Sequence, residues 1–545
     1  MVMLNYRLDD INKIIGKKLS LKTYDELAFN FGLDLEIGED VLNFEITSDR
    51  TDIVSKYSLA NVLANAMNVK IKRYLDINKE NSEVFVYKTI RPFVNVLHVK
   101  LLKKIGNDLQ ELINMQERLD KNIGRNRHKS AIGLFDYSKI EFPITYHEEN
   151  PKNVKFVPLG YKNEKTYSEI IKEVEQAKEY SSLVTSKPIV WTDKSRRILA
   201  MPPIINSDYY SVSEDTDDLL VDITGTDRIT VNAVTKILIH NFQFIGRVSL
   251  LKVYYKQKSI DTGLSFKTHQ FTVNSESVKS LLGIELSKNE IIKILSRLDY
   301  SLKENGKDLL VAPPFYRQDI MHQVDIVDDL MRVIGVNNIK EIYPHSYSDG
   351  SFLYFHYKLK NIRDVAVGLG YQEIDINTLT NERYQFQNTF IKAEDYVSLL
   401  KLKSGDVTMA AKNVFPELLR LISNNLHKKF PQNVFSISNV IKKSDSDVIF
   451  SNSKRLSIVS CSKDVNLTDI LSAVKKIISD SFNADITAEI NYDFKDTFIP
   501  GRSYRIAVNG KDIGFVGEIH PRVLNAFGIE LPASIAEIYL DELLV

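Results

Sequence analysis

Four carboxylates lie close together in one short segment of the 545-residue chain. They are Asp319, Asp325, Asp328 and Asp329. In a helix that begins near Ile320, residues three and four positions apart share a face, so the last three project together and Asp319 lies just before the first turn. Densely packed oxygen ligands are what a hard divalent cation such as Mg²⁺ requires. The segment is therefore a candidate magnesium site.

A second interpretation of this segment needs no metal. Acidic residues gather at helix N-termini, where the helix dipole favours negative charge. Asp319 would then be the N-cap of the helix, and Arg332 would be a counter-charge one turn beyond Asp328 and Asp329. Spacing alone leaves both interpretations open.

Another set of polar residues surrounds an apolar strand expected near residues 219–223. Pro202 and Pro203 fix an extended backbone in the preceding segment. Small hydroxyl and carboxylate residues beside an apolar strand are typical of a lined pocket. Residues of these kinds lie within 201–207, at Thr216 and within 219–227.

A basic run at residues 121–129 includes a glycine, Gly124, and two arginines, Arg125 and Arg127. Such a run is usually a solvated charged loop. It is also suited to contacting the phosphates of a nucleic acid. Both interpretations stay open.

The acidic residues need a helix to hold them, and the surrounding sequence predicts one. Pro313 and Pro314 set an extended lead-in. Gly335 is placed to end the helix. Apolar residues recur between them at helical spacing, so we expect one buried stripe made of Val324, Val327, Met331 and Ile334.

Two earlier stretches predict mixed helices and strands. Residues 42–46 alternate like a half-buried strand, and a capped turn at 47–52 precedes a helix. From residue 271, a short strand, two short helices and a hairpin follow one another, with Ser287 and Glu290 forming a capping box. This order suggests a winged-helix-like module.

The C-terminal part predicts helices packed against an antiparallel sheet. An amphipathic helix ends near Gly370, and Asn509-Gly510 separates two strand patterns, which is a strong hairpin signal. Cys461 follows an apolar run and is expected to be a buried strand residue. The predicted fold class is therefore a multidomain α+β protein.

Length and composition bound the possible functions. A chain of 545 residues predicts about three or four domains. Lys+Arg and Asp+Glu number 71 each, which excludes a protein that grips polyanions over its whole surface. A single cysteine excludes an intramolecular disulfide and a Cys-based zinc site.

Targeting and nucleotide-binding signals are missing from the sequence. The first ten residues carry acids where a signal peptide needs an apolar region, and no uncharged apolar run is long enough to cross a bilayer. We therefore expect a cytoplasmic protein with no membrane partner. There is also no phosphate-binding GK[ST] loop, no dinucleotide fingerprint, no H-E-x-x-H and no nucleophile elbow.

Several motifs resemble one known family. Arg317-x-Asp319-Ile320 with the acids that follow up to Gly335 is similar to the tRNA-synthetase domain of phenylalanine–tRNA ligase β subunits of the archaeal and eukaryotic type. The stretch 45–52 resembles the signature near the start of that family, and 514–521 resembles its catalytic-like domain. The resemblance covers nearly the whole chain. This chain has Asp where the family often has Glu in the last two acidic positions, and residues 49 and 51 depart from the usual Asn-Arg-Pro-Asp.

The resemblance implies roles for the candidate residues. It implies that Asp319, Asp325, Asp328 and Asp329 coordinate Mg²⁺. It also implies a pocket that hydrolyses tyrosine mischarged onto the phenylalanine tRNA. There the residues Asn206, Asp222, Thr224 and Thr226 would bind the phenol or position a water, while Arg125 and Arg127 would hold the tRNA end.

The resemblance further implies a domain division and an assembly. The expected domains are an N-terminal α/β module at 1–88, an editing domain at 89–262, a winged-helix-like domain at 263–344 and an inactive class II synthetase-like core at 345–545. In an α2β2 heterotetramer, a separate α subunit would bind ATP and Phe, while this chain scaffolds the interface, contacts tRNA and edits. Two alternatives are a structural or RNA-binding partner that does not edit, and a free-standing aminoacyl-ester hydrolase.

Overall fold

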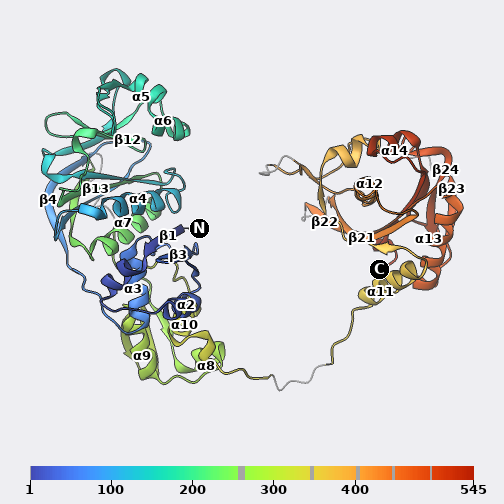
Figure 1. The fold of residues 1–545 in the computed structure, drawn as a ribbon, viewed down its shortest axis with the longest axis horizontal. Helices are drawn as coiled ribbons and strands as arrows, with labels where there is room; N and C mark the ends of the chain where they lie inside the picture. The colour runs from blue at the N-terminus through green and yellow to red at the C-terminus, as the bar shows by residue number, and fades with distance from the viewer. Residues whose placement is uncertain are drawn as a thin grey trace. The chain divides into compact units, whose positions relative to one another are not determined.

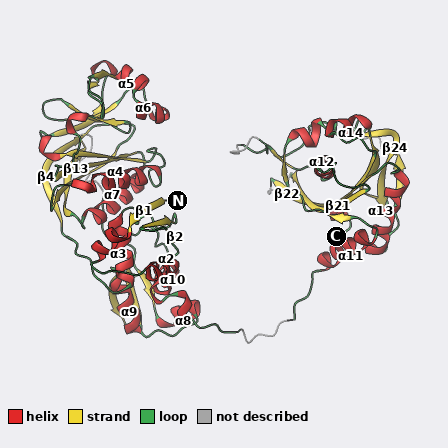
Figure 2. Cartoon of the chain, viewed as in Figure 1, coloured by secondary structure: helices red, strands yellow, loops and turns green. Residues whose placement is uncertain are grey.

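The computed structural model describes residues 2–255, 264–343, 349–400, 406–444, 449–490 and 494–544. The chain divides into two compact units, Met1–Tyr343 and Pro344–Val545 (Figure 1). Each unit contains helices and sheets, which confirms the predicted multidomain α+β class (Figure 2). The division into four domains stays a prediction, and its boundaries at 262/263 and 344/345 lie outside the described residues.

The first elements of unit 1 form a small α/β module on a three-stranded sheet, in the order β1-β3-β2. Alternate residues of β3 are buried, as its sequence predicts, and the capped turn after it leads into α3 with Ser55 as the N-cap. The elements are β1 Val2–Arg7, α1 Leu8–Ile15, α2 Leu21–Phe31, β2 Asp34–Ile37, β3 Val41–Ile46 and α3 Lys56–Ala66.

A nine-stranded sheet follows, in the order β12-β11-β10-β7-β4-β14-β5-β13-β6. Helices α4 and α7 cover one face, where Leu112 and Val234 share a core with Val221. The large strands and helices are β4 Ile77–Val86, β5 Phe93–Leu101, α4 Leu109–Lys121, β6 Ser130–Asp136, β7 Ile144–Glu148, β10 Ile189–Thr192, β11 Ile198–Met201, β12 Ile205–Asn206, β13 Asp218–Gly225, α7 Arg228–Phe242 and β14 Gly246–Tyr255. Smaller elements between β7 and β10 are β8 Lys155–Phe156, β9 Lys165–Thr166, α5 Tyr167–Glu173 and α6 Glu175–Glu179.

The nine-stranded sheet is strongly curled. Nε1 of Trp191 on β10 donates a hydrogen bond of 3.0 Å to Oδ2 of Asp222 on β13. Four strands lie between β10 and β13 in the sheet order, so a flat sheet would place them about 24 Å apart at a strand spacing of about 4.8 Å. Curling brings side chains from distant strands into one interior.

The last part of unit 1 has a three-stranded sheet, in the order β15-β17-β16, and three helices. The predicted capping box is present at the start of α9, where Ser287 and Glu290 exchange hydrogen bonds. The elements are β15 Phe271–Val273, α8 Ser275–Leu282, α9 Lys288–Arg297, β16 Ser301–Asn305, β17 Asp308–Ala312 and α10 Gln323–Ile334.

The prediction for α10 was wrong in its start and its buried face. The helix begins at Gln323 with His322 as N-cap, because Asp319 is held by an arginine outside the helix. Of the predicted stripe only Val327 is buried, and Val324 is 43% exposed. The helix packs against α2, α8 and α9, so its buried arc is broad and includes Asp329.

Unit 2 has a seven-stranded sheet, in the order β18-β21-β22-β26-β25-β24-β23. Helices α11 and α13 pack on one face, and α12 and α14 pack on the other. All strand pairs are antiparallel except β18 with β21. The elements are α11 Tyr354–Gly368, β18 Gln372–Glu373, β19 Leu379–Thr380, β20 Met409–Ala410, α12 Phe415–Asn424, β21 Gln432–Lys443, β22 Phe450–Cys461, α13 Leu467–Phe482, β23 Thr487–Ile490, β24 Phe498–Val508, β25 Lys511–Ile519, α14 Pro521–Phe527 and β26 Ala533–Tyr539.

Two local predictions in unit 2 are confirmed. Asn509 and Gly510 join β24 to β25 with φ values of 52° and 79°, as a two-residue hairpin turn requires. Cys461 is fully buried at the end of β22. None of the helices in the described part of the chain is both long and apolar enough to span a bilayer.

Candidate functional site

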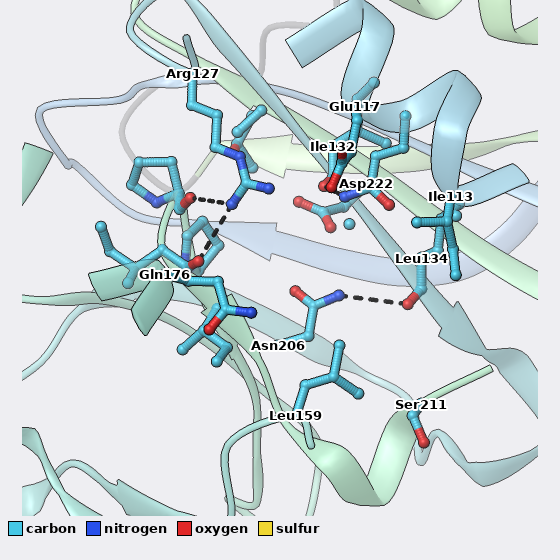
Figure 3. A pocket seen from close by; sticks show the side chains of 18 of the residues that line it. Ile113, Glu117, Arg127, Ile132, Leu134, Leu159, Gln176, Asn206, Ser211 and Asp222 are labelled. Carbon is cyan, nitrogen blue, oxygen red and sulfur yellow. Dashed lines mark hydrogen bonds between the residues drawn. The ribbon is translucent and has the colours of Figure 1, made fainter. Parts of the chain in front are cut away.

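A cavity of about 300 Å³ lies beside β6, the edge strand of the nine-stranded sheet (Figure 3). Its walls come from α4, β6, β13 and the loop 202–206, with Gln176 of α6. The structure brings together most of the residues predicted for a pocket. Those that line the cavity are Asn206, Asp222, Thr224 and Arg127.

Asp222 is the buried acid of the cavity. The residue as a whole is 2% exposed, and Oδ2 of its carboxylate accepts a hydrogen bond of 3.0 Å from Nε1 of Trp191. Its Oδ1 is buried and has no hydrogen-bond partner within the described residues. Burial raises the pKa of Asp222 from 3.8 to about 7. This carboxyl can therefore change its protonation state near neutral pH, as a general acid or base must.

Asn206 and Thr224 supply neutral polar groups to the same space. Asn206 Nδ2 donates to the Leu134 carbonyl at 3.4 Å, and Figure 3 shows Asn206 and Asp222 on facing sides of the cavity. The hydroxyl of Thr224 is buried without a hydrogen-bond partner among the described residues. Buried polar atoms without partners are uncommon and indicate a place for water or a ligand.

Arg127 does not stand free to bind phosphate. Its Nη1 donates to the carbonyls of Pro203 and Ile204 at 3.1 and 3.2 Å, and its Nε lies 3.2 Å from Oδ2 of Asp120. The guanidinium also lies 4.4 Å from the ring centre of Tyr180. Arg127 therefore connects the loop at 202–206 to Asp120 on α4 and to Tyr180, the residue after α6.

The other two predicted residues lie outside the cavity lining. The hydroxyl of Thr226 donates to the carbonyl of His128 at 2.9 Å on the surface. Arg125 is exposed, with a positive φ of 53°. Its role as an RNA contact stays a prediction.

Sequence reasoning missed three residues that surround Asp222. Trp191 donates to its carboxylate, Gly133 lies opposite it on β6, and Asp120 is a second buried acid whose pKa burial raises to about 7. A glycine inside an apolar strand can mark a close approach, so Gly133 carried a usable signal. No local pattern pointed to Trp191 or Asp120.

The four predicted magnesium ligands are divided by an arginine. Arg317 donates to Asp319 from Nε at 2.8 Å and Nη2 at 2.6 Å, and to Asp329 from Nη1 at 2.7 Å and Nη2 at 3.2 Å. Asp325 instead accepts from the backbone N–H groups of Met321 and His322, and Asp328 accepts from Arg332 at 2.6 Å. The counter-charge from Arg332 agrees with the metal-free interpretation of this segment, but its N-cap was wrong, because His322 caps the helix together with Asp325 and Asp319 does not.

These carboxylates do not fit a four-acid magnesium site. Asp319 and Asp329 already neutralise a buried guanidinium, and no group of three or more His, Cys, Asp or Glu in the described ranges is placed to hold a metal ion. Burial alone would raise the pKa of Asp329, but Arg317 holds it below its ordinary value. Both acids therefore act as charged partners of Arg317.

A second buried ion pair lies beside Arg317. Arg50 donates to both oxygens of Asp52 at 2.9 Å, and each of these residues is at most 3% exposed. Burial opposes ionisation of Asp52, but Arg50 and then Arg317 lower its pKa to about 2. The stretches 45–52 and 317–329, which carried the family resemblance, thus meet in one charged cluster. We call Arg50, Asp52, Arg317, Asp319 and Asp329 the arginine clasp.

Glu537 is a fully buried acid of unit 2. Its Oε2 accepts from the N–H groups of Val414 and Phe415 at 2.9 and 3.0 Å, where α12 begins. Burial raises the pKa of Glu537 from 4.5 to about 7. A raised carboxyl pKa stabilises the folded state fully below pH 4.5 and loses that effect as the pH rises through about 7.

We expect Glu537→Gln to be more stable than the wild type at pH 8 and close to it at pH 5. Glutamine keeps an acceptor for the two N–H groups and carries no charge, so the difference between the two pH values should be about 2–3 kcal/mol. Urea unfolding of unit 2 at both pH values, followed by circular dichroism, measures it. The exposed Glu489→Gln is the matched control. An equal effect of Glu537→Gln at pH 5 and pH 8 would contradict the prediction.

Comparisons with known proteins agree across the chain. A family model described as the phenylalanyl tRNA synthetase beta chain CLM domain matches residues 339–540, and one described as the tRNA synthetase B5 domain matches residues 271–336. The phenylalanine–tRNA ligase β subunit of Pyrococcus horikoshii is 30% identical over 554 residues, covering 98% of each chain. That of Saccharolobus solfataricus is 32% identical over 555 residues, covering 99% of this chain and 98% of the relative.

A solved structure is similar to part of this chain. It is the crystal structure of an N-terminal fragment of the phenylalanyl-tRNA synthetase β subunit from Pyrococcus horikoshii, which superposes with a TM-score of 0.56 at 27% identity. The match covers 61% of this chain and 99% of the fragment.

Proposed function

This chain belongs to the family of phenylalanine–tRNA ligase β subunits, and from that premise we propose that it is an editing subunit. Its reaction is the hydrolysis of tyrosine from mischarged phenylalanine tRNA, in the cavity around Asp222. The observation that carries the proposal is the buried Oδ1 of Asp222, which has no hydrogen-bond partner in the part of the chain that the structure describes, at a cavity that Asn206 and Thr224 also line.

An editing activity is needed because a binding pocket can select phenylalanine over tyrosine only to a limited degree. A pocket for phenylalanine must reject tyrosine, which differs by one hydroxyl group. An apolar pocket excludes an added hydroxyl only weakly, so a second site that hydrolyses the wrong product supplies the missing accuracy. An editing site needs polar groups that recognise this hydroxyl or hold a water, and the cavity offers a carboxylate, an amide and a hydroxyl.

The reaction uses water and needs no group beyond those of the chain. The water oxygen attacks the ester carbonyl carbon, the bond from that carbon to the ribose oxygen breaks, and the ribose oxygen takes a proton. Tyrosine and free tRNA are released. Asp222, which titrates near neutral pH, either accepts a proton from the water or binds the phenol.

A separate α subunit is the proposed partner that binds ATP and phenylalanine and charges the tRNA. Unit 2 carries exposed apolar residues at and before α11, where Phe352, Leu353 and Tyr354 are 76%, 70% and 67% exposed. Neighbouring apolar residues on a surface are typical of a subunit interface. We propose that 345–545 is a synthetase-like core without its own catalytic site and that it contacts the α subunit in an α2β2 assembly.

The remaining domain roles are also proposals. Residues 89–262 would edit, 263–344 would form a winged-helix-like domain, and Arg125 would contact tRNA. Magnesium at the acidic segment stays a prediction that the geometry described above does not favour, so no step is assigned to it.

The test is to express this chain with a candidate α subunit and to purify the complex. We expect a heterotetramer by size measurement, phenylalanine-dependent ATP–pyrophosphate exchange, and release of tyrosine from Tyr-tRNA that was prepared separately. A complex that charges phenylalanine but leaves Tyr-tRNA intact would be a non-editing assembly. Deacylation by this chain alone as a monomer would favour the free-standing hydrolase.

A further inference from the structure

We propose that Trp191 and Gly133 are positioning residues, which together fix the carboxylate of Asp222 in the wall of the cavity, Trp191 by donating to Oδ2 and Gly133 by leaving space for Oδ1. The effect of these two residues on catalysis rests on the proposed editing function. The positioning itself concerns only this chain and can be measured without tRNA.

Trp191 fixes one oxygen of the carboxylate. Its indole is 1% exposed, and its Nε1 donates to Oδ2 of Asp222 at 3.0 Å. Its ring packs against Tyr146, with ring centres 4.8 Å apart and planes at 47°. The indole therefore has little freedom to turn away, and Oδ2 has a permanent donor.

Gly133 leaves space for the other oxygen. It lies directly opposite Asp222 in the pairing of β6 with β13. A Cβ atom at this position would lie 2.0 Å from Oδ1 of Asp222 and 2.8 Å from the Phe135 ring, which no real structure tolerates. The backbone φ of Gly133 is not positive, so the glycine is required by space and not by conformation. Any larger residue would push the carboxylate of Asp222 away from the position that it occupies beside β6.

Other charged and titratable groups lie near Asp222 and affect the pKa of its carboxyl group. Arg91 lies beside it and its attraction favours the ionised form, as does the indole N–H. Asp120 on α4 opposes ionisation through its own charge, and Arg127 is paired with Asp120. Tyr146 on β7 also faces Asp222. Of these groups and Trp191, only the indole donates a hydrogen bond to the carboxylate within the described residues, so its removal should have a specific effect.

The first test uses the isolated full chain. Trp191 is the one tryptophan in the sequence, so intrinsic fluorescence reports directly on the group that contacts Asp222. We expect a pH-dependent change in emission with a midpoint near pH 7, which disappears in Asp222→Asn. A wild-type emission that does not titrate, or a transition that survives in Asp222→Asn, would overturn the coupling whether or not the protein edits.

The second test uses the complex with the α subunit and follows deacylation of Tyr-tRNA against pH. If ionised Asp222 is the active form, the wild-type rate rises with pH through about 7. Trp191→Phe removes a donor to the charged form, so the midpoint should move upward by about one pH unit while the plateau at high pH is largely kept. Gly133→Ala displaces the carboxylate and should lower the plateau itself by about tenfold or more.

Tyr209→Phe is the control, because Tyr209 is 55% exposed and is not among the residues that line the cavity. An inactive wild type would overturn the proposed function, and the fluorescence titration would still decide the positioning. An active wild type whose pH midpoint is unchanged in Trp191→Phe would overturn the positioning and leave the editing function intact.

Discussion

Replacing Asp329 with asparagine is expected to lower the free energy of unfolding of unit 1 by about 3–5 kcal/mol. Asp329 is 2% exposed, and it accepts from Arg317 and from the hydroxyl of Tyr300 at 2.8 Å. Removing its charge leaves the buried Arg317 guanidinium with Asp319 as the one acid in the described residues that it still contacts by hydrogen bonds, while Asp52 stays paired with Arg50. Breaking one partner of a buried ion pair is costly because the remaining charge keeps its desolvation penalty.

The matched control is Asp328→Asn, the same chemical change one residue away. Its carboxylate is 38% exposed and pairs with Arg332 on the helix surface, so its loss should cost less than about 1 kcal/mol. Denaturant unfolding of the full chain, followed by the fluorescence of Trp191, reports on unit 1 because that residue is the one tryptophan and lies in this unit.

The same experiment separates the arginine clasp from a magnesium site. A metal held by four carboxylates would make Asp325→Asn and Asp328→Asn as costly as Asp329→Asn, and a chelator would destabilise the wild type. The clasp predicts that addition of a chelator leaves the unfolding midpoint unchanged. A chelator-induced loss of stability, together with similar costs for all the asparagine variants, would contradict the clasp.

Replacing Asp222 with asparagine is expected to slow the release of tyrosine from Tyr-tRNA by the complex about 10²- to 10⁴-fold. Asparagine occupies the same space beside Gly133 and can still accept from Trp191, but it cannot take up a proton near neutral pH. Phenylalanine charging should be unchanged, because the proposed site of that reaction lies on another subunit.

The control for this second variant is Asp215→Asn. Asp215 is 85% exposed and pairs only with Lys104 among the described residues, outside the cavity lining. Single-turnover deacylation of Tyr-tRNA by excess complex measures the chemical step without product release. Unchanged deacylation by Asp222→Asn would remove this residue from the reaction, and equal losses in both variants would indicate a general effect on the domain.

The sequence predicted local structure well where the signals act over a few residues. The capping box at Ser287 and Glu290 and the Asn509-Gly510 turn are present as expected. It failed for α10, because helical periodicity fits several rotations of the helix and the choice depends on what packs against it. The anchoring of Asp319 by Arg317 displaced the start of that helix.

The predictions for the cavity also succeeded where the signal was local and failed where the contacts come from distant residues. Asn206, Asp222 and Thr224 were recognisable as polar residues beside an apolar strand, and they line one cavity. No local sequence pattern indicated that Arg127 would donate hydrogen bonds to the backbone carbonyls of Pro203 and Ile204. Its partners lie 76 and 77 residues away in the sequence, and they are neighbours only after the loop folds back.

The sequence by itself determined the family, the fold class and local features such as the capping box at Ser287 and Glu290 and the Asn509-Gly510 turn, because these depend on motifs and on contacts between close neighbours in the chain. Only the tertiary structure decided which carboxylate meets a tryptophan and which meets an arginine. The free energy of a buried charge depends on the partners that surround it, and those partners come from strands and helices far apart in sequence.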